Sequence, residues 1–303
     1  GLPGSAQLSL VSGVTGTIPA DGTVQTYNAN APGESIYLKF AAKTADNLEL
    51  VLSNASVTGA YSDGFTVNVY NHVGVQVAST WCYPNSPSGN CNLHLWYMAA
   101  DTYSVTVTPI YGGTLHFDTL IQPNVVGTPV AMNGTENVSL GMAQVERFTF
   151  NANVGDTVAL QVSGVTTMPA GQAIQFLVYR PDAGAITVYT PAYSNFSPSD
   201  GQLVNLPNLP VSGTYTVVAI PAFGLPGNAQ FRLVPGVTGG VPPGSPAQTY
   251  NANAPGENVY LNFTANTGDN LEFVLSNMSV VGAYSDGFIV SVYNHVGAQV
   301  AST

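Results

Sequence analysis

Apolar and polar residues alternate along most of this chain. The period of two is clear in residues 101–109, where Tyr103, Val105 and Val107 are separated by Ser and Thr residues, and it recurs in residues 48–52. Turn residues (Gly, Pro, Asn and Asp) recur about every ten positions, and no segment has a helical period. The pattern predicts an all-β fold of tandem antiparallel β-sandwich domains, Ig-like or jelly-roll-like, with about eight strands each.

A long internal repeat divides the chain. Residues 27–34 (YNANAPGE) are identical to residues 250–257, an offset of 223, and this offset holds without a gap from 1–80 to 224–303. About 57 of the 80 paired residues are identical. The sequence therefore contains one full 223-residue unit and the first 80 residues of the next.

A weaker repeat lies inside this unit. Residues 38–53 align with 148–163 at an offset of 110, and residues 101–109 align with 213–221 at an offset of 112. The unit is therefore interpreted as two related domains, A and B. The predicted order is the last strand of a preceding B-type domain (1–12), domain A (13–122), domain B (123–235) and a truncated second copy of A (236–303).

Both incomplete segments are expected to be completed by neighbouring β-strands. Continuation of the same polypeptide is the favoured source, because tandem arrays produce such repeats. Strand donation by another copy is the alternative.

The chain has few charges but enough apolar residues for a core. Only 7% of residues are charged and 45% are hydrophobic, while Lys and Arg together number five. No basic patch exists to neutralise phosphates, so nucleic acid is not an expected partner. No stretch approaches 18 consecutive apolar residues, and no membrane-spanning segment is expected.

The two cysteines, Cys82 and Cys91, bracket a loop rich in Pro, Gly and Ser. A disulfide between them would stabilise a hairpin and would indicate an oxidising compartment. A zinc site that includes His94 is the competing interpretation, but two thiols and one His do not fill a tetrahedral shell.

Domain B resembles the bacterial pre-peptidase C-terminal domain, a small β-sandwich appended to secreted enzymes. The resemblance rests on FTFNANVGDTVALQVS (148–163), VYRPDAG (178–184) and SGTYTVVAIP (212–221), and domain A keeps the pattern more loosely in 69–75 and 101–107. It implies a fold and secretion more than an activity. Some members of that family are associated with substrate binding or calcium, but no binding motif carries over to residues here.

His72 and its repeat His295 are the strongest candidates for chemistry. Asp63 and Ser79 lie near His72 in sequence, so a Ser-His-Asp site is possible by residue type. The internal repeat places His72 opposite Asp182, before a turn glycine, which favours a role in the turn. No catalytic residue is predicted.

The acidic residues Asp46, Asp156 and Asp269 recur at one position of the repeat. They are interpreted as Asx-type turns, and calcium binding is the alternative, although calcium takes six to eight oxygen ligands. Lys39 and Lys43 are interpreted as exposed lysines, because their repeats are Asn262 and Asn266 and an isopeptide crosslink cannot recur there. No metal or cofactor is predicted.

Two further features concern the surface. Aromatic residues near the cysteines could form a binding patch, namely Trp81, Tyr83, Trp96 and Tyr97. Glycosylation motifs occur at Asn54, Asn133, Asn137, Asn262 and Asn277, with a weaker one at Asn195.

The favoured function is a non-catalytic structural repeat unit of an extracellular fibre, filament or cell-surface stalk, with other copies of itself or its own continuation as partners. The alternative is a carbohydrate- or protein-binding accessory or adhesin module of a large secreted protein, with surface glycans as possible partners. Many copies of the 223-residue unit favour the first function, and one or two copies beside a catalytic domain favour the second.

Overall fold

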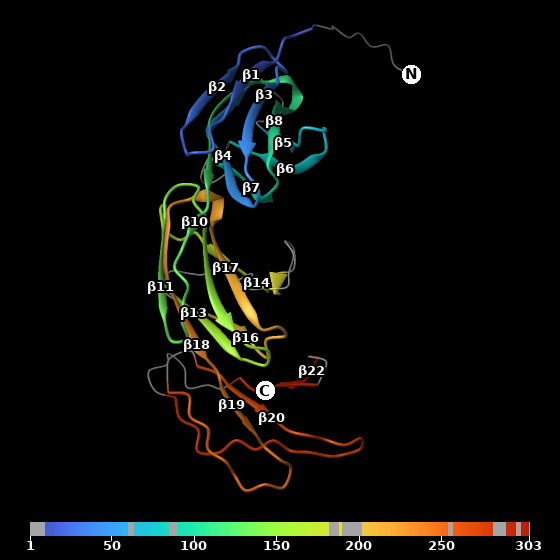
Figure 1. Ribbon diagram of the computed structural model, residues 1–303, viewed down its shortest axis with the longest axis vertical. Coiled ribbons are helices and arrows are strands. Elements are labelled where there is room, and N and C mark those ends of the chain that lie inside the picture. Colours follow the sequence, from blue (N-terminus) through green and yellow to red (C-terminus); the bar gives the residue numbers. More distant parts are fainter. Residues whose placement is uncertain are drawn as a thin grey trace. The chain divides into compact units, whose positions relative to one another are not determined.

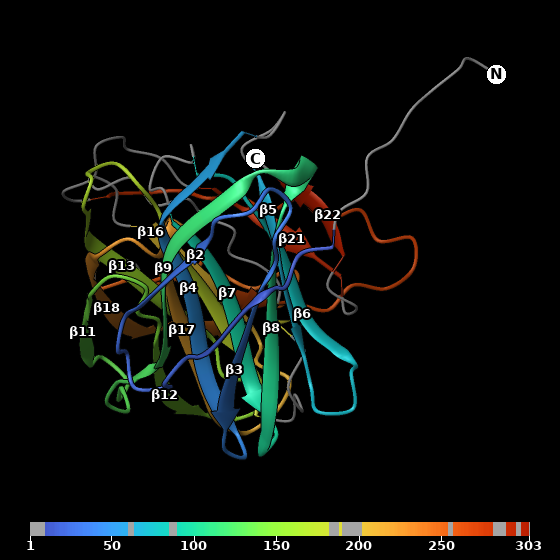
Figure 2. The same ribbon diagram turned by 90° about the horizontal axis from the view of Figure 1, so that it is seen from above.

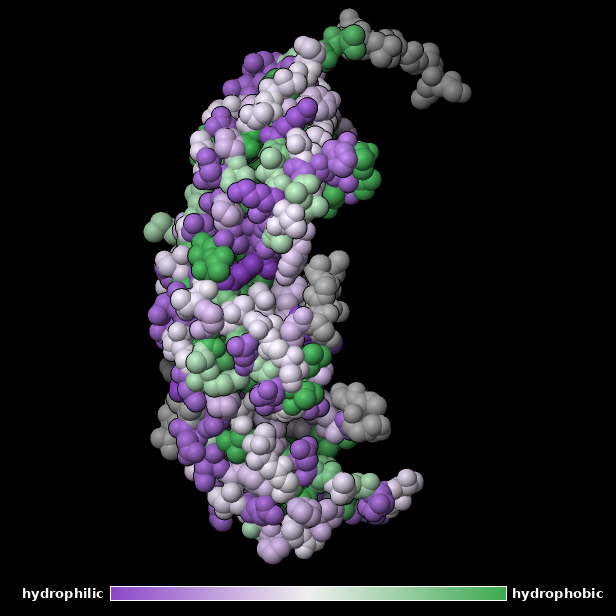
Figure 3. Space-filling view, in the orientation of Figure 1, coloured by the Kyte–Doolittle hydropathy of each residue, from purple (hydrophilic) through white to green (hydrophobic). Residues whose placement is uncertain are grey.

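The computed structural model describes residues 10–59, 64–84, 90–181, 188–189, 202–253, 257–280, 289–294 and 298–302. Within these ranges the regular structure consists of strands and two short 3-10 helices, Ile110–Gly112 and Ala222–Gly224 (Figure 1). The predicted all-β fold is therefore confirmed. Hydrophilic and weakly hydrophobic residues cover most of the face in Figure 3, as expected for a chain with few charges.

The first sandwich packs two sheets around one core. One sheet has the order β1-β3-β8-β5-β6 and the other β2-β9-β4-β7. The β5–β6 hairpin lies at one edge of its sheet (Figure 2). The inward residues of these strands form a single buried cluster, which includes Phe65, Phe117 and Leu50. The strands are β1 (Val14–Thr17), β2 (Gln25–Ala29), β3 (Ile36–Ala42), β4 (Asp46–Thr58), β5 (Phe65–Tyr70), β6 (Gln76–Cys82), β7 (Cys91–Met98), β8 (Asp101–Pro109) and β9 (Thr114–Pro123).

The second sandwich repeats this arrangement. Its sheets have the orders β10-β12-β17-β14-β15 and β11-β18-β13-β16, and its core includes Phe148, Phe176 and Phe231. The strands are β10 (Val125–Val126), β11 (Thr135–Leu140), β12 (Glu146–Ala152), β13 (Val158–Thr167), β14 (Ile174–Tyr179), β15 (Val188–Tyr189), β16 (Gln202–Leu206), β17 (Gly213–Pro221) and β18 (Gly227–Pro235).

The first strand of each sandwich is parallel to its neighbour, which differs from the antiparallel prediction. Val14 in β1 pairs with Ile36 in β3, and Val125 in β10 pairs with Glu146 in β12, both in parallel. Between the paired strands the chain crosses to the opposite sheet as β2 or β11, and it returns in its original direction. Period-two alternation does not distinguish the two directions.

In the part of the chain after β18 that the structure describes, the strands are short: β19 (Val237–Gly240), β20 (Val259–Asn262), β21 (Ser291–Tyr293) and β22 (Gln299–Ser302). Leu271, Phe273 and Leu275 are 48, 44 and 42% exposed, whereas their repeats in β4 are buried in the core between the two sheets of the first sandwich. The apolar face that forms a core in the first sandwich is thus exposed here.

Contacts divide the chain into two compact units. One comprises residues 1–239 and 249–260, and the other comprises 240–248 and 261–303. The boundaries of domains A and B stay a prediction. The predicted B-type strand in residues 1–12 lies almost wholly outside the described residues.

Candidate functional site: the joints between sandwiches

A single residue separates the last strand of each sandwich from the next strand. Asn124 stands between β9 and β10, and Gly236 stands between β18 and β19. Both follow a proline and precede a valine, so the two joints share the sequence Pro-x-Val. The Pro- and Gly-rich segment 241–246 follows β19 and is not part of this joint.

Two backbone hydrogen bonds hold the first joint, one on each side. The N–H of Asn124 donates to the carbonyl of Asn47 in the first sandwich (2.9 Å), and the N–H of Val125 donates to Val145 in the second (2.8 Å). These bonds join both sandwiches to consecutive residues. Rotation at the joint would break at least one of them.

The second joint has the same pair of bonds. The N–H of Gly236 donates to Thr157 and that of Val237 donates to Asn258, both at 2.8 Å. A Cβ atom at Gly236 would lie 2.8 Å from the ring of Tyr260, so this joint requires glycine. The geometry of the joint is therefore a property of the repeat.

A buried polar cluster reinforces the first joint. Glu49 on β4 has no exposed surface and accepts hydrogen bonds from Trp96 Nε1 (2.8 Å) and from Asn124 Nδ2 (3.1 Å), while His94 Nδ1 lies 2.5 Å from its other oxygen. The side-chain amide oxygen of Asn124 accepts a hydrogen bond from Arg147 Nε at 2.9 Å. Asn124 thus links a carboxylate of the first sandwich to a guanidinium of the second.

Aromatic residues surround this guanidinium. The Arg147 side chain lies 4.5 Å from the ring centroid of Trp96 and 5.4 Å from that of Tyr97, and Tyr179 meets Trp96 edge-on at 6.4 Å. Burial lowers the pKa of Arg147 from its ordinary value, and burial raises the pKa of Tyr179. The cluster combines cation–π, stacking and hydrogen-bonding contacts across the joint.

Sequence analysis missed Glu49 and Arg147. Glu49 lies between the inward residues Leu48 and Leu50, and Arg147 directly precedes the inward Phe148, so alternation predicts an outward, exposed side chain for both. The available signal was the pair His94 and Trp96, which occupy alternate positions on strand β7 beside β4.

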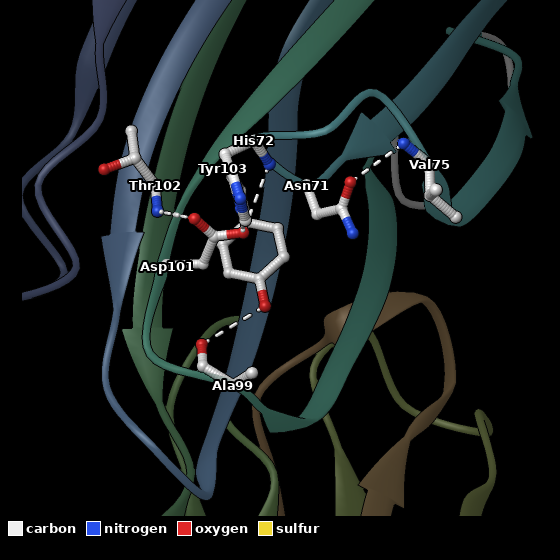
Figure 4. A network of polar contacts seen from close by, with 7 residues as sticks. All are labelled: Asn71, His72, Val75, Ala99, Asp101, Thr102 and Tyr103. Atoms are coloured by element: carbon white, nitrogen blue, oxygen red, sulfur yellow. Dashed lines mark hydrogen bonds and ion pairs between the residues drawn. The ribbon is translucent and has the colours of Figure 1, made fainter.

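His72 lies in the β5–β6 turn, where it contacts Asp101 (Figure 4). Its Nδ1 lies 2.7 Å from Asp101 Oδ2, and its backbone N–H donates to the same oxygen at 3.1 Å. Asn71 accepts from the N–H of Val75 in this turn at 2.8 Å. The repeat has the corresponding bond, from the Ala298 N–H to Asn294 Oδ1 (2.9 Å). Asp63 and His295 lie outside the described residues.

The three repeated aspartates form the same turn. Asp46, Asp156 and Asp269 each accept a 2.7 Å hydrogen bond from the backbone N–H three residues earlier. The preceding residue has a positive φ in every copy, and it is glycine in two of them but Ala45 in the first. The aspartates therefore lie in turns, as predicted, but each carboxylate accepts from the residue that begins the turn and not from the N–H two residues later, as an Asx-type turn requires. Within the described ranges, no group of three or more His, Cys, Asp and Glu side chains could hold a metal ion.

The remaining candidates lie at the surface. Lys39, Lys43 and the five asparagines at 54, 133, 137, 262 and 277 are exposed, and glycosylation of the asparagines stays a prediction. Asn54 and Asn277 have φ values of 50° and 53°, and the corresponding residue of the second sandwich is Gly164. Asn133 likewise has a φ of 65°, so backbone conformation explains asparagine at three of these motifs.

Cys82 and Cys91 form a disulfide that joins β6 to β7. Trp81 and Tyr83 beside it are 64 and 51% exposed. Trp96 is five residues beyond Cys91, about 16 Å along the strand at 3.3 Å per residue, and belongs to the joint. The structure therefore divides the four aromatic residues between two places.

No protein-family model matches the sequence, and no curated protein matches it. The pre-peptidase C-terminal domain of a collagenase from Bacillus anthracis is similar in structure, with 12% identity, over 37% of this chain and 99% of that domain, at a TM-score of 0.28. The tandem CBM22 domains of Paenibacillus barcinonensis Xyn10C (10% identity, 71% of this chain and 95% of that one, TM-score 0.24) and the CUB1-EGF-CUB2 domains of human MASP-1/3 (8%, 70% and 99%, TM-score 0.23) are also similar. At these TM-scores the likeness assigns neither a family nor an activity to the chain. Among the described residues, no helix is long and apolar enough to cross a membrane.

Proposed function

We propose that this protein is a non-catalytic structural repeat unit of an extracellular fibre, filament or cell-surface stalk. The observation that carries the proposal is the one-residue joint, which occurs after both sandwiches with the same two backbone hydrogen bonds. A flexible linker would let successive sandwiches move independently. A joint of one bonded residue limits that motion, which suits a load-bearing array of repeats.

The polar cluster supports the same proposal. Burial of the Glu49 carboxylate is favourable only while Asn124, Trp96 and His94 hydrogen-bond to it, and the buried Arg147 guanidinium depends on its Nε contact with Asn124. Bending at the joint would expose or orphan these groups. Bending would therefore break hydrogen bonds whose strength depends on their direction. A purely apolar contact would not add this cost.

The proposed partners are A-type strands from another copy of the chain or from its continuation. Leu271, Phe273 and Leu275 expose an apolar face whose counterpart on β4 is buried in the core of the first sandwich, in a sheet where β7 and β9 pair with β4 on either side. Strands of the same sequence would fit this face in the same register. The disulfide suits the proposed extracellular location, because such bonds persist in oxidising compartments.

Electron microscopy of recombinant chains with increasing numbers of the 223-residue unit tests this function. We expect extended particles whose contour length grows in proportion to the number of units and whose successive sandwiches keep a constant angle. Particles with randomly bent joints would contradict the proposal.

The alternative function, a binding module, is favoured by one observation. Val77 and Trp81 on the edge strand β6, and Val75 and Tyr83 directly before and after it, are exposed at odd-numbered positions that are interrupted only by Ser79. Such an apolar stripe is suited to glycan or protein contacts. Screening the oxidised protein on a glycan array, with Trp81→Ser as the control, tests this alternative. Binding that requires Trp81 would support it over the structural role.

A further inference from the structure

Two carboxyl groups meet beneath the strand that follows the first joint. Glu146 on β12 is buried, with 4% of its surface exposed, and its carboxyl lies beside that of Glu136 on β11, because Oε1 of each group reaches the same position next to Gly127. Glu146 is also the strand partner of Val125, which directly follows the joint residue. The carboxyl pair is therefore part of the attachment of the joint to the second sandwich.

The backbone is shaped around this pair. A Cβ atom at Gly127 would lie 2.5 Å from Glu146 Oε1 and 3.0 Å from Glu136 Oε1, so only glycine leaves space for both carboxyl groups. Thr128 donates its N–H to Glu136 Oε1 (3.2 Å) and its hydroxyl to Oε2 (2.5 Å). The N–H of Ser139 donates to Glu146. Residues 127 and 128 thus lie against the carboxyl groups of Glu136 and Glu146.

No basic side chain faces the pair among the described residues of the elements around it. Arg147 follows Glu146 in β12 and points to the opposite face of its sheet. On β18, Phe231 is opposite Glu136, and Arg232 is opposite Thr135 on the other face. Ala219 of β17 is the remaining strand partner of Glu146. Among the described residues of these strands, Glu136 is the one acid or base that faces Glu146.

Two ionised carboxylates cannot hydrogen-bond to each other, because each is only an acceptor. One proton between them turns the contact into a donor and an acceptor. Burial, and then the charge of Glu136, raises the pKa of Glu146 to about 7. The proton is therefore retained well above the usual range of a glutamic acid.

We propose that Glu136 and Glu146 share one proton and act as a pH-sensitive latch that holds residues 125–128 against the second sandwich. When the proton is lost, two adjacent carboxylates repel each other beneath Gly127. The raised folded-state pKa means that the stabilisation is complete below the ordinary pKa of glutamic acid and is lost as pH rises through about 7. The joint is thus firm in mild acid and looser in mild alkali.

Hydrogen exchange of the whole chain tests the latch. The informative amides are those of Val125, Gly127 and Val130, which donate to Val145, Arg147 and Thr149 of the second sandwich. After correction for intrinsic exchange, their protection should fall about tenfold from about pH 6 to about pH 8.5, as linkage requires for a folded pKa near 7 and an open-state pKa near 4.5. Glu146→Gln, which stays neutral and keeps a donor, should remove this pH dependence.

Glu34→Gln, in the first sandwich, is the matched control and should keep the wild-type pH dependence. Protection that changes less than twofold in the wild type, or a Glu146→Gln protein with the wild-type dependence, would overturn the proposal. If Glu146→Gln does not fold, an NMR titration of the wild-type Glu146 carboxyl carbon decides the question. An apparent pKa near 7 supports the latch, and a pKa in the ordinary range of glutamic acid refutes it.

Discussion

The backbone N–H of Asn124 donates a 2.9 Å hydrogen bond to the carbonyl of Asn47. At the second joint, the backbone N–H of Gly236 donates the equivalent bond to the carbonyl of Thr157, although the donor and the acceptor are different residue types in the two joints. The side chains at the joints vary while the backbone geometry recurs. A backbone-encoded joint can be repeated many times in a chain whose sequence drifts, which is what a structural array requires.

Replacement of Glu49 by Leu should destabilise the first sandwich by about 2–4 kcal/mol, because it leaves buried donors on Trp96 and Asn124 without an acceptor. Denaturation followed by tryptophan fluorescence measures this loss, since both tryptophans lie in the first sandwich. Glu272→Leu changes the repeat of Glu49, whose side chain is exposed, and should cost under about 0.5 kcal/mol. Equal effects of the two substitutions would refute the role of the cluster.

Ala45→Gly should stabilise the first sandwich by about 0.5–1 kcal/mol. Ala45 has a φ of 66°, a conformation that costs a residue with a Cβ roughly 1–2 kcal/mol. The reverse change at the equivalent turn, Gly155→Ala, should destabilise the second sandwich by a similar amount. Thermal unfolding of both variants checks the two signs, and Ala41→Gly, within strand β3, should be destabilising.

The pair of His72 and Asp101 should be visible in an NMR titration. The hydrogen bond from His72 lowers the pKa of Asp101 below its ordinary value. The stability that this contact gives is present above the unfolded-state pKa and is lost as pH falls through the lower folded-state pKa. In His72→Ala the pKa of Asp101 should return toward its ordinary value, while Asp118, whose pKa Asn54 lowers, should not change. An unchanged pKa of Asp101 in His72→Ala would contradict the contact between His72 and Asp101.

Loss of the disulfide should cost the first sandwich about 2–3 kcal/mol. Cys82 and Cys91 are nine residues apart, and the entropy of closing a loop of that length sets this scale. The double substitution to Ser, compared with the oxidised protein by chemical denaturation, measures the effect. Unfolding at the same denaturant concentration would show that the strands β6 and β7 need no crosslink.

The sequence contained most of the fold but little of the joint. Alternation predicted the inward residues Leu48, Leu50 and Leu52, and the repeated aspartates predicted the turns, because both are local properties. Alternation also predicted that Glu49 is exposed, and that prediction was wrong. A neighbouring domain can cover an outward face of a strand, and this depends on contacts between residues that are distant in sequence. Here these are the contacts of Glu49 with Asn124 and of Asn124 with Arg147.

The sequence pattern also did not show whether the first strand of each sandwich runs parallel or antiparallel to its neighbour. The repeat identified Val14 and Val237 as equivalent, and both donate to the residue before the neighbouring strand, Ser35 or Asn258. Parallel pairing arises because the intervening strand lies in the other sheet. Such a crossover leaves no mark on the local pattern of apolar residues.

The most direct test of the stiff joint is a distance distribution between spin labels at Val77 in the first sandwich and Val154 in the second, both exposed. The labels are attached to introduced cysteines while the native disulfide stays oxidised, and double electron–electron resonance is recorded for the whole chain. A control carries a short Gly-Ser insertion between Asn124 and Val125. The account predicts one narrow distribution for the native joint and a broad one for the insertion. A native distribution as broad as that of the insertion would contradict it.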